Sequence, residues 1–327
     1  MAVLFVFVDG VGAGARDAER NPLARRDHLL SRFADGSGAP LPAGGAWALA
    51  DACLGVPGRP QSATGQTTIL TGENAPRALG KHLLGFPNAA LREILRRRSI
   101  FRALAAAGRR GTFANAYPVA YLRALGIPCE GEPEPQIVAG ARRVPRPSAT
   151  TCAFDAAGGR FHTWSDARAG RALTHDITGS RARGHGAGIP PRTPAEAAEV
   201  LLRLAVDRDL VLFEFFETDE AGHAQAMDHA LEALGRLDLF LRTLVERLPG
   251  GWSLVVASDH GNVEDLSSRN HTLAPVPVLG FGPAAARVGE VEDLTRLGPL
   301  LLDLAGAGGG ADLPAAGATL PPARAGR

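Results

Sequence analysis

The chain has 327 residues, of which 45% are hydrophobic and 21% are charged. This composition is typical of a globular protein, and the length suits one large domain or one domain that carries an insert. The 35 basic and 34 acidic residues leave a net charge of +1, so the sequence indicates no surface for nucleic acid or for an anionic membrane.

The cysteines and the first residues of the chain indicate the cellular compartment in which the protein is expected. Cys53, Cys129 and Cys152 are odd in number and widely spaced, which favours neither a disulfide framework nor a zinc knuckle. The apolar stretch 2–8 lacks a basic lead and stops at Asp9, and no apolar run approaches the roughly 18 residues that span a bilayer. We therefore expect a soluble protein of the reducing cytoplasm.

The first expected element is a strand over Val3–Val8, a continuous apolar run of the kind found in a parallel sheet covered on both faces. It ends at Asp9-Gly10. A carboxylate at the carboxyl end of a buried strand lies where open α/β sheets place ligands, although a simple turn aspartate is the alternative. Between residues 13 and 60 the pattern indicates a short helix near Asn21–Phe33 and then a Gly/Pro-rich loop.

A hydroxyl-rich segment follows at Ser62-Ala63-Thr64-Gly65-Gln66, just before a helical pattern. A serine in this place is expected to be the helix N-cap, with its hydroxyl beside unpaired backbone N–H groups that favour negative charge. Ser62 is therefore the candidate nucleophile, and Thr64 is its nearest rival. The alternative for Ser62 is a purely structural cap.

Helical periodicity predicts helices over Asn88–Arg98 and Ser99–Ala107, and Thr112–Tyr117 is expected to form the next strand. Strand, helix, helix, strand is the order of a doubly wound sheet. From 118 to 189, scattered Pro and Gly and the lack of a long amphipathic helix predict an inserted cap.

Regular alternation then resumes as far as residue 305, and the Gly/Ala/Pro-rich tail 306–327 is expected to be flexible. The sequence predicts an α/β fold with a doubly wound, mostly parallel sheet, helices on both faces and a small inserted cap. Residues 1–117 and 190–305 would form the core. The elements expected after the cap are helices over Thr193–Val206 and Ala226–Arg247 and strands over Leu210–Phe216, Ser253–Ala257 and Pro275–Phe281.

Acidic and histidine residues follow two of these later strands. Asp219 and His223 are four residues apart, so one helical turn can aim both at one point, although a capping aspartate with a surface histidine is the alternative. Asp259 and His260 end the next strand and can share a ligand only if the chain turns there, which Gly261 permits. His271 follows eleven residues later.

Together with Asp9, these residues place three carboxylates and three imidazoles at one edge of one sheet. Mixed Asp/His ligation suits a borderline divalent ion such as zinc or manganese, with magnesium as the alternative. Six such groups and a serine oxygen are enough for two ions, and two ions can activate a nucleophile and clamp a phosphoryl group.

These motifs resemble the alkaline phosphatase superfamily, on the branch of cofactor-independent phosphoglycerate mutase and phosphopentomutase. The resemblance covers roughly residues 1–117 and 190–305 and implies an alkaline-phosphatase-like core. It also implies that Asp219, His223 and His271 bind one metal ion, that Asp9, Ser62, Asp259 and His260 bind the other, and that Ser62 is transiently phosphorylated. The matching segments are Asp9-Gly10-Val11-Gly12, Ser62-Ala63-Thr64-Gly65-Gln66, Asp219-Glu220-Ala221-Gly222-His223, Asp259-His260-Gly261-Asn262 and His271-Thr272 with Pro275-Val276-Pro277.

Two departures from the branch bear on the reaction. Gln66 stands where the branch usually has histidine, and the insert is far shorter than the cap of phosphoglycerate mutase. We therefore expect a phosphomonoester hydrolase that acts on a small phosphorylated metabolite, with a phosphomutase as the alternative and a non-catalytic metal-binding homologue as the second. Expected substrate contacts are Thr64, Gln66, Arg142, Arg143, His175 and Asp176.

Overall fold

The structure, a computed structural model, describes residues 1–131, 133 and 145–308. Its centre is a six-stranded sheet with the order β2-β8-β7-β1-β6-β3. All neighbouring pairs are parallel except those that involve β8, which runs antiparallel to β7 and to β2. The strands are β1 Val3–Val8, β2 Ala46–Ala50, β3 Gly111–Phe113, β6 Leu210–Phe215, β7 Ser253–Ser258 and β8 Val276–Phe281.

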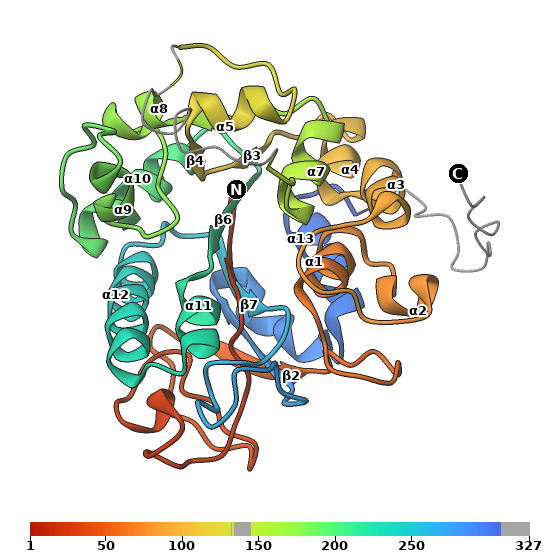
Figure 1. Cartoon of the computed structure of the whole chain (residues 1–327), viewed down its shortest axis with the longest axis vertical. Coiled ribbons are helices and arrows are strands. Elements are labelled where there is room, and N and C mark those ends of the chain that lie inside the picture. The colour runs from red at the N-terminus through yellow and green to blue at the C-terminus, as the bar shows by residue number, and fades with distance from the viewer. Residues whose placement is uncertain (132, 134–144, 309–327) are drawn as a thin grey trace.

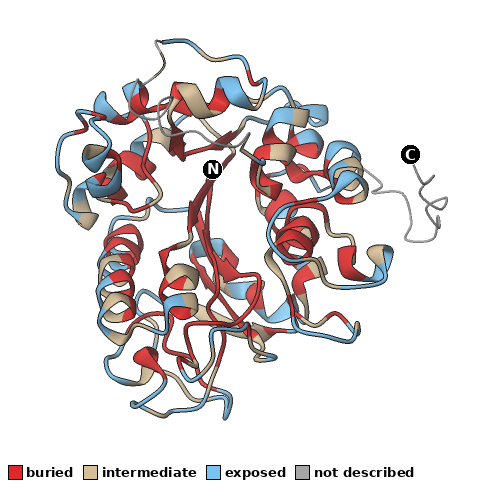
Figure 2. Ribbon diagram, in the orientation of Figure 1, coloured by how far each residue is buried: buried red, intermediate tan, exposed pale blue. Residues whose placement is uncertain are grey.

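Helices cover both faces of this sheet (Figure 1). The apolar strands read as continuous runs because both faces are buried, and β1, β6, β7 and β8 are buried at every position (Figure 2). The predicted mostly parallel α/β fold is thus confirmed. One face packs against α1 Ser62–Thr71, α3 Ala89–Arg98, α4 Ile100–Ala106, α7 Ala149–Ala156 and α13 Leu297–Leu304, and the other against α10 Pro194–Ala205, α11 Glu217–Ala224 and α12 Met227–Glu246.

The region between β3 and α10 consists of short elements. Two-residue strands form a separate parallel pair, and the eight-residue helix α7 packs against α1 and α3. The division into a core and a cap at residues 118–189 stays a prediction. The other elements here are β4 Ala116–Tyr117, α5 Val119–Ala124, β5 His162–Thr163, α8 Trp164–Arg168 and α9 Ser180–Gly184.

Three expectations about local structure were wrong. The helix expected near Asn21–Phe33 is only the 3-10 turn Pro22–Ala24, because Pro and the Asn21 cap fix one turn that no apolar periodicity extends. The strand expected over Thr112–Tyr117 is two strands in two sheets: β3 pairs with β6, whereas β4 pairs with β5. Ser62 is also not the N-cap, since Gln61 holds that position and Ser62 is the first helical residue.

The predicted flexible tail lies largely outside the described residues, which end at 308. None of the described helices combines the length and the apolar character that a membrane crossing requires. The short helix α2 Ala75–Leu79 follows α1 and packs against α1 and α3.

The order of the three central strands determines where the candidate site lies. β7, β1 and β6 are neighbours, so their carboxyl ends bring together residues near 259, 9 and 217 that are far apart in sequence. Gly10 has φ +72°, and a Cβ at this position would lie 2.6 Å from Asp219 Oδ1. Only glycine therefore lets the chain after β1 turn while the start of α11 approaches it.

Gly65 plays a comparable part in α1, where a Cβ would lie 2.9 Å from the backbone oxygen of Asp259. We expect Gly65→Ala to lower the free energy of unfolding of the metal-free protein by about 1–3 kcal/mol, because backbone atoms must shift to admit the methyl group. Gly235→Ala in α12 is the matched control, since nothing lies within 4 Å of its added Cβ. It should stabilise the protein by up to about 1 kcal/mol through helix propensity. Urea unfolding measures both, and an unchanged midpoint for Gly65→Ala would refute the packing argument.

Candidate metal centre and active site

A buried cluster lies at the carboxyl ends of β1 and β7. Asp9 is 8% exposed, and Asp259 and His260 are fully buried. His260 Nε2 lies 3.2 Å from Asp9 Oδ1 and 3.5 Å from Asp259 Oδ2. Ser62 Oγ, from the first turn of α1, lies 3.0 Å from the same nitrogen. Four side chains from three separate segments therefore converge on one point.

A second cluster lies at the start of α11. His223 Nε2 is 3.2 Å from Asp219 Oδ2, and His271 Nε2 is 3.6 Å from Asp219 Oδ1. The two Nε2 atoms are 3.3 Å apart. The His223 side chain is 39% exposed, whereas that of His271 is 2% exposed. This second cluster is therefore the one that solvent reaches.

Backbone carbonyls fix how these two histidines present their rings. His223 Nδ1 lies 2.7 Å from Arg269 O, and His271 Nδ1 lies 2.9 Å from Pro60 O. Each Nδ1 must carry a hydrogen to bond a carbonyl oxygen, so in the neutral ring each Nε2 presents a lone pair toward Asp219. A hydrogen bond from the outer nitrogen to a carbonyl is the usual support of a metal-binding histidine.

The two clusters adjoin. The rings of His260 and His271 stack with centroids 3.7 Å apart and planes 14° from parallel. Within each of the two groups of acid and histidine ligands, the candidate ligand atoms all lie within 4.8 Å of one another. All seven predicted ligands are thus brought into one continuous site.

Negative charge buried at this site is poorly compensated by hydrogen bonds. Among the described residues, Asp9 Oδ1 and both carboxylate oxygens of Asp259 have no hydrogen-bond donor. Burial and the charge of Asp219 raise the pKa of Asp9, and burial and the charge of Asp9 raise the pKa of Asp259 well above its usual range. Buried, unsatisfied carboxylate oxygens beside an imidazole fit a divalent cation.

The same charges act on the histidines. Burial by itself would lower the pKa of His260, but Asp259, Asp9 and Asp219 together raise it to about 10. Burial and the charge of His260 lower the pKa of His271 to about 4. The proton on His260 therefore offsets part of the negative charge of the carboxylates around it.

Sequence reasoning missed a residue that ties the ligand loops together. The buried Glu264 accepts hydrogen bonds from the backbone of Gly12 at 2.9 Å and of Asn262 at 2.8 Å, and from the hydroxyl of Thr272. It thereby joins the loops that follow β1 and β7 to the segment before β8. No spacing signal in the sequence marks Glu264. Asn262 adds a bond of 2.7 Å from its Nδ2 to Asp219 Oδ1.

Geometry favours Ser62 over Thr64 as the nucleophile. Thr64 is fully buried, and its hydroxyl donates to Gln61 O at 3.1 Å and accepts from Leu83 N at 3.3 Å. Ser62 is half-buried and its hydroxyl lies at the metal-ligand cluster. Because Ser62 is the first helical residue and not the cap, its oxygen reaches across to His260 and not back to its own helix.

The other expected substrate contacts lie in different surroundings. Gln66 is buried in α1 beside Phe5 and Phe7, and Asp176 accepts bonds from Gly179 N at 3.1 Å and Arg181 N at 3.0 Å. These bonds order the loop that carries α9, and a substrate contact by either residue stays a prediction. Arg142 and Arg143 lie outside the described residues.

His175 is held as a neutral hydrogen-bond donor. The Asn115 amide is oriented by the backbone of Glu214, since Nδ2 donates to its oxygen and Oδ1 accepts from its N–H, both at 2.8 Å. The second Nδ2 hydrogen therefore reaches His175 Nδ1, also at 2.8 Å. With Nδ1 accepting, the ring proton lies on Nε2. Burial lowers the pKa of His175 to about 4, so this neutral form persists at pH 7.

The comparisons with known proteins agree with this geometry. Residues 192–307 match the family described as Metalloenzyme superfamily. A 2,3-bisphosphoglycerate-independent phosphoglycerate mutase of Hahella chejuensis is 35% identical over 104 residues, which is 29% of this chain and 20% of that protein. This chain therefore spans about a fifth of that relative's length.

Similarity in fold extends over most of the chain. The PH0037 protein from Pyrococcus horikoshii has a TM-score of 0.54 and 14% identity, over 94% of this chain and 97% of its own. Alkaline phosphatase from the Antarctic bacterium TAB5 has a TM-score of 0.50 and 10% identity, over 94% of this chain and 98% of its own. The fold is alkaline-phosphatase-like. The match of residues 192–307 to the Metalloenzyme superfamily and this fold together support the predicted resemblance to the alkaline phosphatase superfamily, on the branch of cofactor-independent phosphoglycerate mutase.

We expect the purified chain to bind about two divalent ions after loading with manganese or zinc. His223→Ala should lose the ion of the partly exposed cluster and Asp259→Ala that of the buried cluster, so each variant should retain about one. His229→Ala, on the neighbouring helix α12 and outside both clusters, is the control and should retain both. Elemental analysis of desalted protein gives the count. An unchanged count in both ligand variants would show that the ions bind elsewhere.

Proposed function

We propose that this chain transfers phosphoryl groups through a phosphoserine at Ser62 and acts as a phosphomonoester hydrolase on a small phosphorylated metabolite. One observation carries the proposal: Ser62 Oγ lies 3.0 Å from His260 Nε2, among carboxylate oxygens that have no hydrogen-bond donor within the described chain. A hydroxyl at this point would be activated as a nucleophile.

The residues that would hold the ions follow from the two clusters. Asp9, Ser62, Asp259 and His260 would hold one ion, and Asp219, His223 and His271 the other, with manganese or zinc suited to the mixed oxygen and nitrogen donors. When bound, such ions lower the pKa of a coordinated hydroxyl and neutralise charge on a phosphoryl group. The expected second alternative, a non-catalytic homologue, would have lost ligands, whereas this chain keeps all seven.

The chain's own groups supply the rest of the proposed reaction. The Ser62 oxygen forms a bond to phosphorus as the bond from phosphorus to the metabolite oxygen breaks, and water then displaces Ser62 and releases orthophosphate. The first turn of α1 directs backbone N–H groups toward the phosphoryl oxygens, since Ser62 is the first helical residue.

His175 would contact the metabolite beyond its phosphate. Its ring lies 4.7 Å, centroid to centroid, from that of Phe216, which directly precedes α11. Asn115 follows β3, two strands from β1, which is a lateral distance of about 10 Å at ordinary strand spacing. That distance suits a donor to the leaving group and not to the phosphoryl group itself.

Hydrolysis is favoured by access of water to the site. The His223 side chain is 39% exposed, and the described elements within the expected cap, residues 118–189, are helices or strands of two to eight residues. A mutase must exclude water from its phosphoserine and hold the intermediate while it reorients. One observation favours the alternative, a phosphomutase: the relative from Hahella chejuensis is named a phosphoglycerate mutase.

Ser62→Ala should abolish turnover of the metal-loaded enzyme and leave its fold and ion content close to wild type, because the other ligands remain. Thr64→Val is the matched control and should keep turnover within a few-fold. Intact-mass and peptide analysis of protein quenched during turnover should find the phosphoryl group on Ser62. Phosphate trapped on Thr64, or wild-type rates in Ser62→Ala, would overturn the assignment.

Hydrolase and mutase are separated by their products. We expect the metal-loaded enzyme, incubated with a panel of sugar and glycerate phosphates, to release orthophosphate that phosphorus NMR detects. Positional isomers that form without free phosphate would contradict hydrolysis and establish the mutase.

A further inference from the structure

A second cavity lies at the amino-terminal edge of the sheet, away from the metal centre. It has a volume of about 380 Å³. The segments around it come from α4, the start of β3, the turn after α7 and the residue pair before β6. β6 runs for six residues from this edge to the edge of the metal centre, which is about 20 Å at the usual rise per residue. The lining includes Phe101, Arg109, Arg110, Phe154, Arg160, His162 and Arg208.

Charge distinguishes this arginine pocket, by which we mean the cavity lined by Arg109, Arg110, Arg160 and Arg208. Among the described residues, four guanidinium groups and no carboxylate line it. The carboxylates that pair with these arginines do not line the cavity. Three of the ion pairs are long: 3.4 Å between Arg109 and Asp209, 3.9 Å between Arg110 and Asp207, and 3.9 Å between Arg160 and Asp166. Each guanidinium has five N–H donors, so one such contact leaves most of them available.

His162 gives an independent indication of a ligand. Its side chain is only 9% exposed, and neither ring nitrogen has a hydrogen-bond partner among the described residues. Its Nδ1 lies 3.7 Å from Asp166 Oδ2, which is too far for a hydrogen bond. Burial lowers the pKa of His162, so its neutral ring offers one donor and one acceptor beside the cavity. A buried polar group without a partner is costly unless something completes its hydrogen bonds.

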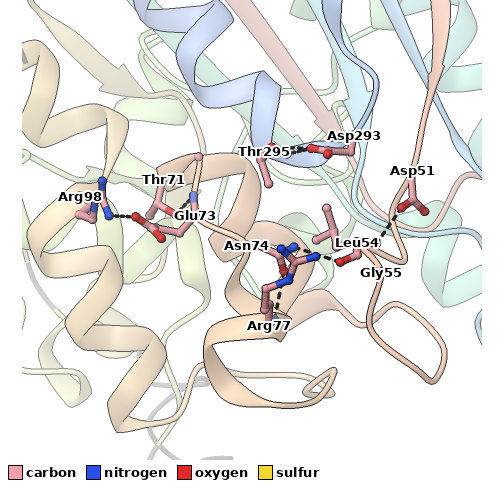
Figure 3. A pocket seen from close by; sticks show the side chains of 11 residues that line it. Asp51, Leu54, Gly55, Thr71, Glu73, Asn74, Arg77, Arg98, Asp293 and Thr295 are labelled. Atoms are coloured by element: carbon pink, nitrogen blue, oxygen red, sulfur yellow. Dashed lines mark hydrogen bonds and ion pairs between the residues drawn. The ribbon is translucent and has the colours of Figure 1, made fainter. Parts of the chain in front are cut away.

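Another cavity differs from the arginine pocket because acidic and basic side chains line it together. It has a volume of about 470 Å³ and lies at the end of α1, where Arg77 and Arg98 face Asp51, Glu73 and Asp293 (Figure 3). Four of these five charged groups are already engaged: Arg98 pairs with Glu73, Asp51 accepts from Leu54 N at 2.9 Å, and Asp293 accepts from Thr295 N at 2.7 Å. That cavity contains charged groups of both signs, three carboxylates and two guanidinium groups, whereas all the charged groups that line the arginine pocket in the described chain are arginines.

We propose that the arginine pocket binds an oligophosphate group, either inorganic or carried by a nucleotide. Guanidinium groups bind phosphate oxygens through paired hydrogen bonds, and four of them match the charge of a di- or triphosphate better than that of a single orthophosphate. The volume is within the range of small-molecule sites. The apolar floor of Phe101 and Phe154 adds a surface for a ligand that carries more than phosphate.

Isothermal titration of the metal-loaded protein with magnesium tripolyphosphate and with magnesium ATP tests the proposal, since the magnesium limits removal of the bound ions. Both should bind more tightly than orthophosphate. Equal affinities would show that the phosphate chain suffices, and tighter binding of ATP would show that the nucleoside also contacts the pocket. Hydrogen exchange should slow in peptides covering 101–112 and 154–163 and not in those covering 59–70.

Variants make the assignment specific. The double variant Arg110→Gln/Arg160→Gln should weaken binding at least tenfold, whereas Arg102→Gln, an exposed arginine of α4 outside the pocket, should not. Asp207→Asn should tighten binding, because Asp207 pairs with both Arg110 and Arg208. No binding, binding unchanged in the double variant, or protection confined to 59–70 would overturn the proposal. None of these results depends on whether Ser62 is phosphorylated.

Discussion

Carboxylates buried together at the ends of neighbouring strands are the constraint on which this molecule depends. Asp9, Asp219 and Asp259 follow β1, β6 and β7, and Asp9 and Asp259 are almost fully buried. Two like charges about 4 Å apart repel by roughly 4 kcal/mol at the effective dielectric constant of a protein. The imidazolium of His260 offsets part of this repulsion, and bound cations would offset the rest. Because ions that bind only the folded chain stabilise it, metal binding and folding are expected to be coupled.

Close approach of backbone segments is what allows these charges to meet. A Cβ at Gly65 would strike Asp259, one at Gly10 would strike Asp219, and one at Gly261 would strike Glu264 and Thr272. Gly261 therefore serves the site by leaving room for its neighbours, and its φ is not in the left-handed region. Glu264 then holds the loops after β1 and β7 in one arrangement through its bonds to Gly12 and Asn262.

Much of the core could be predicted from the sequence, because buried parallel strands appear as continuous apolar runs. The acids that follow three of these strands could be named as candidate ligands in the same way, and the structure brings them together. β1 begins and ends where the apolar run does, and β6 and β7 differ from prediction by one residue at the carboxyl end. Local patterns could not show that residues 112–117 divide between two sheets, since that depends on pairing with β6 and β5, about 45 to 100 residues away. Tertiary structure likewise brings Asn115 and Glu214 to His175. It also brings Arg110 and Arg160 to the same cavity.

Anomalous diffraction from crystals grown with manganese or zinc tests the central claim most directly, because it locates each ion and does not only count them. The account predicts two anomalous peaks about 4 Å apart. One should be bound by Asp9, Ser62, Asp259 and His260, and the other by Asp219, His223 and His271. A single peak, or peaks away from Ser62, would contradict a two-metal centre built around this serine.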